Sequence, residues 1–237
     1  KRLCSEAPLI LVDTIGTGKS KQDVDESRIL LPQVANDLRE IILELNRPQI
    51  NLLGYSYGGT VAMTFAHKHP EMLHTLVLVA TILGGSSYVP PTPEVGQQLT
   101  RPDGNTLEEK TEAIWRLCIS ESRLAQYRSV MEETLKKQMR NLTPLEVLKR
   151  QLLNYREFDG TQFAKECKVP TLIITGEDDR LTPMQNSQNL HEALPNSELV
   201  VIKDCEHMPY LEKTDEFVQL LKSGIRSEEH TSELQSP

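Results

Sequence analysis

Short apolar runs that alternate with helix-like stretches constrain the fold of this chain more than any other feature. Each run has five or six residues, the length and composition of a buried strand. The runs occupy residues 9–13, 50–54, 75–80, 171–175 and 198–202. Between the first two, apolar residues from Val34 to Leu45 recur at helical spacing after Pro32, which suits a first helical turn. Since parallel strands need long crossovers, this alternation predicts an α/β fold with a mostly parallel sheet flanked by helices.

Residues 84–163 interrupt the alternation. They open with the Pro- and Gly-rich stretch GGSSYVPPTPEVG, and three predicted helices follow without a strand between them. Thr106 and Glu109 form a capping box that predicts the start of the first of these helices. We expect this helical insertion to lie over the sheet as a cap. The predicted organisation is a core from two segments (1–83 and 164–225), the cap (84–163), and a non-native or disordered tail (226–237).

Composition excludes several classes of partner. The formal net charge of −8 and the pI near 5.4 argue against nucleic acid or an anionic membrane as a partner. The sequence contains no run of 18 apolar residues that could span a membrane. The four cysteines are far apart and form no C-x-x-C pair, so we expect no metal site and no disulfide framework. A reducing, cytoplasmic location is the default expectation.

The most specific motif is Gly54-Tyr55-Ser56-Tyr57-Gly58, which matches G-x-S-x-G between a predicted strand and a predicted helix. The turn must be sharp, so we expect Gly54 and Gly58 to be the small residues where the strand and helix backbones pass closely. Such a turn exposes the Ser56 hydroxyl at the helix N-terminus. There the backbone N–H of Tyr57 can point at a developing oxyanion.

A serine hydroxyl is a weak nucleophile, so it needs a base and an orienting carboxylate. Two later segments supply these groups: the acidic cluster 177–179 follows the strand at 171–175, and His207 follows the strand at 198–202. Both lie at carboxyl ends of predicted strands, where open α/β sheets form their sites. The chain order of serine, acid and histidine is the order found in α/β-hydrolases.

On these motifs, residues 9–225 resemble the α/β-hydrolase-fold serine hydrolases. The stretch DTIGTGKS (13–20) is similar to the family's D-x-x-G-x-G-x-S loop, and GEDDRLTP (176–183) to its G-x-x-D-x-x-x-P motif. The resemblance implies that Asp179 is the acid, His207 the base and Ser56 the nucleophile, without a cofactor. Glu206 stands where the family's G-x-G-H-x-x segment has a glycine.

Two further residues are candidates for contact with the substrate. Tyr55 flanks the nucleophile and Met208 follows the histidine, so either side chain can line the pocket or simply pack. The expected partner is a small-molecule acyl compound.

The resemblance also predicts an N-terminal truncation. Family members usually begin with about three more strands and a His-Gly loop that supplies a second oxyanion donor. The first eight residues, KRLCSEAP, offer neither. One absent strand would lie between those at 9–13 and 50–54, so we expect this chain to be a poor enzyme.

Three functional hypotheses follow. The first is a serine hydrolase that cleaves a carboxylic ester or similar acyl substrate; lactone, thioester, amide, C–C bond and haloperoxidase chemistry remain open. Ser56 argues against dehalogenases and epoxide hydrolases, which place Asp at that position. The second is a receptor or scaffold that binds a small molecule without catalysis. The third, a phosphate loop at DTIGTGKS, would need a glycine where Asp13 stands and a helix after Ser20, and the sequence shows neither.

Overall fold

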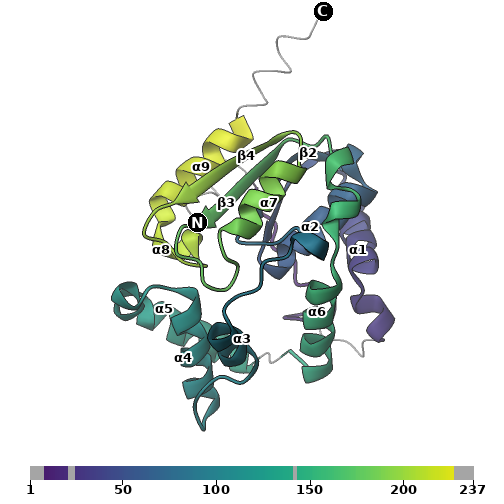
Figure 1. Ribbon diagram of the computed structural model, residues 1–237. Coiled ribbons are helices and arrows are strands. Elements are labelled where there is room, and N and C mark those ends of the chain that lie inside the picture. Colours follow the sequence, from purple (N-terminus) through teal and green to yellow (C-terminus); the bar gives the residue numbers. More distant parts are fainter. Residues whose placement is uncertain (1–7, 21–24, 141–142, 227–237) are drawn as a thin grey trace, which may run out of the picture.

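A four-stranded parallel sheet forms the centre of the protein in the computed structural model, which describes residues 8–20, 25–140 and 143–226 (Figure 1). The strands are β1 (Ile50–Tyr55), β2 (Leu73–Val79), β3 (Thr171–Gly176) and β4 (Ser197–Ile202). They lie in the order β1-β2-β3-β4, and every neighbouring pair is parallel. The predicted α/β fold and four of the five predicted strands are therefore confirmed.

Helices cover both faces of this sheet. On one face, α1 (Leu31–Glu44), α2 (Tyr57–Lys68) and α7 (Gln185–Ala193) pack on inward residues such as Leu76 and Leu78. On the other, α9 (Thr214–Arg226) packs Phe217 and Leu221 on Val77 and Val79. Because successive strand residues point to opposite faces, β2 contributes to both cores and must be apolar almost throughout.

The strand predicted at residues 9–13 is wrong. These residues have no regular secondary structure, and Leu11 is 86% exposed. A strand exists only where its backbone groups pair with a neighbour, and the described part of the chain offers this run no such partner. An apolar run of strand-like composition is therefore not sufficient to predict a strand.

The segment between β2 and β3 is helical. It contains α3 (Pro93–Thr100), α4 (Leu107–Cys118), α5 (Glu121–Arg140) and α6 (Leu145–Glu157), and Figure 1 shows α3, α4 and α5 grouped away from the sheet. The capping box of Thr106 and Glu109 starts α4 as predicted. Helix α3 was not predicted, although Thr92 caps it and Pro93 begins it.

The two connections to this helical segment meet. The N–H of Gly85 donates to the carbonyl of Phe158 (3.0 Å), and the N–H of Gly160 donates to that of Leu83 (2.8 Å). Gly84 has a positive φ of 76°, and a side chain there would overlap the Phe158 carbonyl. The chain thus enters and leaves the helical segment at one place. The domain limits 84–163 stay a prediction.

The remaining elements are short. Helix α8 (Pro209–Glu212) precedes α9, and the 3₁₀ helices span Glu26–Ile29, Pro70–Met72, Gly85–Ser87, Gly160–Gln162 and Ala164–Glu166. Within the described ranges, no helix is both long and apolar enough to cross a membrane. Arg226 is the last residue of α9, and the rest of the predicted tail (227–237) lies outside the described residues.

Candidate active site

Ser56 lies in a strained turn between β1 and α2. Its φ of 50° and ψ of −120° are unusual for a residue with a side chain. Three hydrogen bonds hold this backbone: the Ser56 N–H donates to the carbonyl of Val79 (2.9 Å), while the Ser56 carbonyl accepts from the N–H of Gly59 (2.9 Å) and the hydroxyl of Thr81 (2.8 Å). The turn is therefore fixed to β2 on one side and to the first turn of α2 on the other.

Two glycines make this turn possible, and one differs from the expected pair. A side chain at Gly54 would overlap the carbonyl of Gly58 and approach the Cβ of Ala62 to 2.7 Å. A side chain at Gly59 would overlap the side chain of Thr81. At Gly58 a Cβ would meet no atom within 4 Å other than those of its chain neighbours and of the nearby backbone of its own helix. The strand and helix backbones pass closely at Gly54 and Gly58, as predicted, but the helix residue that must lack a side chain is Gly59 rather than Gly58.

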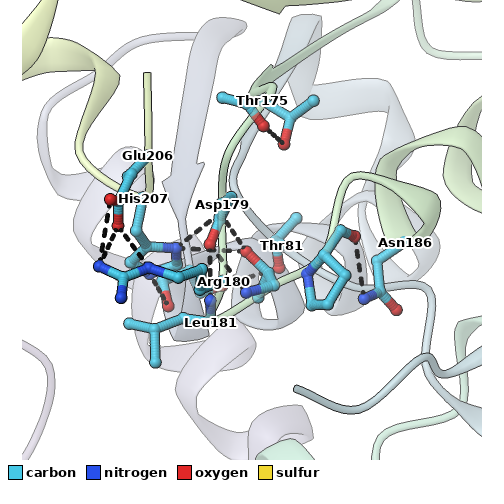
Figure 2. Close-up of polar contacts among 12 residues, drawn as sticks. Thr81, Thr175, Asp179, Arg180, Leu181, Asn186, Glu206 and His207 are labelled. Carbon is cyan, nitrogen blue, oxygen red and sulfur yellow. Dashed lines mark hydrogen bonds and ion pairs between the residues drawn. The ribbon is translucent and has the colours of Figure 1, made fainter. Parts of the chain in front are cut away.

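Asp179 follows β3 and is completely buried, since none of its side-chain surface is exposed. Its Oδ1 accepts the backbone N–H groups of Leu181 and Thr182, both at 2.9 Å. Its Oδ2 accepts the Thr182 hydroxyl (2.6 Å) and faces Nδ1 of His207 (2.8 Å) (Figure 2). The neighbouring Asp178 is exposed. Four donors thus converge on one buried carboxylate.

His207 joins the acid to the serine. Its Nε2 lies 3.1 Å from Oγ of Ser56, and its Nδ1 also lies 3.2 Å from the Thr182 hydroxyl. The imidazole has 5% of its side-chain surface exposed, so only a small opening connects it with solvent. The three residues predicted from separate motifs are brought together in one hydrogen-bonded row.

The N–H of Tyr57 lies at the start of α2. As the first residue of that helix, Tyr57 has no carbonyl one turn earlier in the helix to accept its N–H. A helix N-terminus favours negative charge. The backbone at this position can therefore donate to an oxyanion formed beside Ser56.

Tyr55 and Met208 have packing and backbone roles in the structure. The centroid of the Tyr55 ring lies 5.2 Å from that of the His207 ring. It lies 5.1 Å from the centroid of the Tyr210 ring, which it meets edge to face. Burial raises the pKa of Tyr55 well above its ordinary value. Met208 is half-buried, and its carbonyl accepts the N–H groups of Leu211 and Glu212 (both 2.9 Å). Contact of either side chain with a substrate stays a prediction.

Several residues around the row were not singled out from the sequence. Thr182 donates to Asp179, Arg180 pairs with Glu206, and the buried Glu212 accepts the N–H of Glu206 (2.8 Å). Only the Leu181 N–H contact with Asp179 had a local signal, because an aspartate side chain often accepts the backbone N–H two residues later. The contacts of Glu206 with Arg180 and Glu212 join segments that no short motif links.

The DTIGTGKS loop forms a turn that is closed by its own hydrogen bonds. The Asp13 carboxylate accepts the N–H of Lys19 (3.0 Å), and Gly16 and Gly18 have positive φ values of 82° and 49°. Residues 8–20 contain neither the strand nor the helix that a phosphate loop needs. A cavity of about 320 Å³ lies between this loop and α1, and it contains none of Ser56, Asp179 and His207.

Within the described ranges, no group of three or more His, Cys, Asp or Glu side chains is placed to hold a metal ion. Cys118, Cys167 and Cys205 are free thiols. Burial, together with the nearby Asp179, raises the pKa of Cys118 to about 12, so this thiol stays protonated at neutral pH.

Comparisons with known proteins agree with this geometry. The family model for the alpha/beta hydrolase fold matches residues 3–214. A curated relative from Escherichia coli, 2-hydroxy-6-oxononadienedioate/2-hydroxy-6-oxononatrienedioate hydrolase, is 33% identical over 221 residues, which are 90% of this chain and 74% of the relative. A thermophilic esterase from Thermogutta terrifontis superposes with a TM-score of 0.74 at 25% identity, covering 95% of this chain and 82% of the esterase.

An enol-lactonase from Burkholderia xenovorans superposes with a TM-score of 0.73 at 20% identity, covering 90% of this chain and 78% of the lactonase, and shows the shared fold alone. The relatives are hydrolases by name, and this supports a hydrolase enzyme here. The matched family model and the curated relative together show that the chain belongs to the α/β-hydrolase-fold family.

Proposed function

We propose that the protein is a serine hydrolase that cleaves a carboxylic ester or similar acyl substrate through an acyl-enzyme on Ser56. One observation carries the proposal: His207 lies 3.1 Å from the Ser56 hydroxyl through Nε2 and 2.8 Å from Asp179 through Nδ1. This is the arrangement in which a buried acid orients a base and the base activates a nucleophile.

The proposed reaction has two halves. In the first, Ser56 Oγ attacks the acyl carbon while His207 Nε2 accepts the hydroxyl proton, and Asp179 stabilises the resulting imidazolium. The oxyanion accepts the N–H of Tyr57. The C–O bond to the alcohol then breaks, and His207 returns the proton to the leaving oxygen. In the second half, His207 takes a proton from water while the water oxygen attacks the acyl carbon. The bond between the acyl carbon and Ser56 Oγ then breaks, His207 returns the proton to Ser56 Oγ, and the acid leaves.

The relatives suggest which acyl compounds to test first. One acts, by name, on a 2-hydroxy-6-oxo dicarboxylate and another is an esterase. A ketone carbon and an ester carbon are both electrophiles that an activated serine can attack. We therefore propose a small-molecule acyl substrate, with esters first and 6-oxo dicarboxylates as the second candidate class because of the 33% identity.

The predicted cap would shape the substrate site. Helices α3–α6 follow β2 and precede β3 along the chain. We propose that residues 84–163 cover the acyl pocket and control the access of substrate to it. The cytoplasmic location suggested by the widely spaced cysteines stays a prediction.

Labelling with a fluorophosphonate, followed by intact mass measurement, tests the proposal. Such a probe reacts only with an activated serine, so we expect one adduct, lost in Ser56→Ala and retained in Ser122→Ala, which removes an exposed serine of α5. Hydrolysis of p-nitrophenyl acetate should follow the same pattern. A folded protein that forms no adduct, or whose adduct survives in Ser56→Ala, would overturn it. The non-catalytic binding protein would then become the better hypothesis.

A further inference from the structure

The residue after the acid and the residue before the base are paired with each other. Arg180 follows Asp179, and Glu206 precedes His207. Nε of Arg180 donates to Glu206 Oε2 (3.0 Å), and its Nη2 donates to Oε2 (2.7 Å) and Oε1 (3.1 Å). Figure 2 shows the two side chains meeting beside Asp179 and His207. An ion pair thus links the two loops immediately next to the Asp179–His207 hydrogen bond.

The same guanidinium also contacts the helical segment. Its Nη2 donates to the carbonyl of Arg116 (2.6 Å). This is one of the last four carbonyls of α4, and no N–H group inside the helix donates to these carbonyls. A cation at a helix C-terminus is favoured by the helix dipole. Arg180 therefore joins the loop after β3, the loop after β4 and the end of α4.

A second carboxylate strengthens this junction. The buried Glu212 of α8 accepts the N–H of Glu206 (2.8 Å) through Oε1 and the N–H of Ser120 (3.2 Å) through Oε2. Arg123 of α5 donates to the Glu212 carbonyl. The corner between α4 and α5 is thus hydrogen-bonded to the segment that carries His207.

We propose that Arg180 is a positioning residue that fixes the loops of Asp179 and His207 against each other and against the end of α4. This inference rests on the proposed function. It also accounts for Glu206, which occupies the position where the family motif has a glycine. The hydrogen bonds of its carboxylate lead to Arg180, and none among the described residues joins it to His207.

The two side chains of the Arg180–Glu206 pair differ in burial, and this difference predicts the effect of removing each charge. The Glu206 side chain is 11% exposed, whereas that of Arg180 is 47% exposed. Loss of Arg180 therefore leaves a nearly buried carboxylate without its cation, next to the base. A buried charge without a partner is the costly case, and removal of both charges is milder. Arg180→Gln should consequently do more harm than Arg180→Gln combined with Glu206→Gly.

The test measures the rate of fluorophosphonate labelling of Ser56, and kcat and KM for p-nitrophenyl acetate. We expect Arg180→Gln to lower the labelling rate and kcat roughly 10- to 100-fold with little change in KM, as for a catalytic group displaced by a fraction of an ångström. The double variant should return to within about threefold of the wild-type rate. Arg128→Gln, which breaks the exposed pair of Arg128 with Glu112, is the matched control and should label normally.

Backbone hydrogen exchange separates failure of this inference from failure of the proposed function. In Arg180→Gln we expect faster exchange at both 116–120 and 204–208. In the double variant exchange should slow again at 204–208, where no unpaired carboxylate remains, but not at 116–120, because the hydrogen bond to the Arg116 carbonyl is still missing. If the wild-type protein forms no adduct, the exchange pattern alone decides whether Arg180 holds these segments. Wild-type labelling and exchange rates in Arg180→Gln, or a double variant as slow as the single one, would overturn the inference.

Discussion

The serine and its two partners are held in place by different kinds of force. Ser56 sits in a strained turn whose shape depends on the absence of side chains at Gly54 and Gly59. Asp179 and His207 lie on two loops held by hydrogen bonds, including those from Thr182. Steric constraint is abrupt, because a single methyl group overlaps the backbone. A substitution in a hydrogen-bonded network removes one contact and leaves the others, so the loops can accommodate Glu206 where the family motif has a glycine.

We therefore expect changes to the loops to reduce the rate more than the stability, and changes to the turn to do the opposite. The sharpest case for the loops is Asp179→Asn. The amide has nearly the same shape but no charge to stabilise a protonated His207, and it favours the wrong imidazole tautomer. We expect kcat for p-nitrophenyl acetate to fall roughly 10⁴-fold, about 5.5 kcal/mol in the barrier. Circular dichroism and the melting temperature should show a folded protein; a variant that unfolds would remove the distinction.

The next effect concerns the turn. In Gly54→Ala the new methyl group would overlap the Gly58 carbonyl and crowd Ala62, so we expect a loss of roughly 3 kcal/mol in the free energy of unfolding. Urea denaturation measures it. Gly58→Ala is the matched control, because its methyl group meets no atom within 4 Å beyond its chain neighbours and the nearby backbone of its own helix, and alanine favours a helix. Equal destabilisation by the two variants would show that steric crowding does not define this turn.

Thr182→Val sharpens the comparison on the side of the loops. Valine keeps the shape of the side chain but removes the hydroxyl that donates to Asp179 Oδ2 at 2.6 Å. The two backbone donors to Oδ1 remain, so the acid should stay in place with a less well fixed carboxylate. We expect kcat to fall about tenfold, or about 1.4 kcal/mol. Thr182→Ser, which restores the hydroxyl, should recover most of the rate; failure to recover would assign the loss to the missing methyl group.

The same division separates what the sequence predicts from what it does not. The row of Ser56, Asp179 and His207 lies where motifs at the ends of β1, β3 and β4 place it, because each motif is local and parallel strands bring their carboxyl ends to one edge. Features that depend on contacts between distant segments are harder to predict from the sequence. The run at 9–13 has the composition of a strand, but strands form by pairing, and composition does not identify a partner.

Close contacts between distant segments escape prediction for a related reason. The pattern G-x-S-x-G points to Gly58, yet Gly59 faces Thr81, a residue 22 positions later that only the folded structure brings near. Arg180 and Glu206 are 26 positions apart, and charge alone predicts nothing about their pairing. Helix α3 was hidden because its Thr92-Pro93 start lies inside a stretch rich in proline and glycine, which is typical of a loop.

The smallest predicted effect concerns the pH dependence of stability. Burial raises the pKa of Glu206 above its ordinary value of 4.5, although Arg180 opposes the shift. The folded protein therefore keeps this proton to a higher pH than the unfolded chain. The stabilisation from that proton is fully present below about pH 4.5 and is lost as the pH rises through the folded pKa. Glu206→Gln cannot ionise and lacks this loss.

We therefore expect Glu206→Gln to gain stability relative to the wild type between pH 4 and pH 7, by less than about 1 kcal/mol, or about 4 °C in melting temperature. Urea denaturation at both pH values measures this difference, with Glu112→Gln as a control because Arg128 and Arg116 lower the pKa of that carboxyl and reverse the sign. A gain in stability together with slower labelling of Ser56 would mean that the pair is kept for geometry rather than for stability. A loss of stability at pH 7 would instead make the Arg180–Glu206 pair a stabilising contact and weaken the contrast between the turn and the loops.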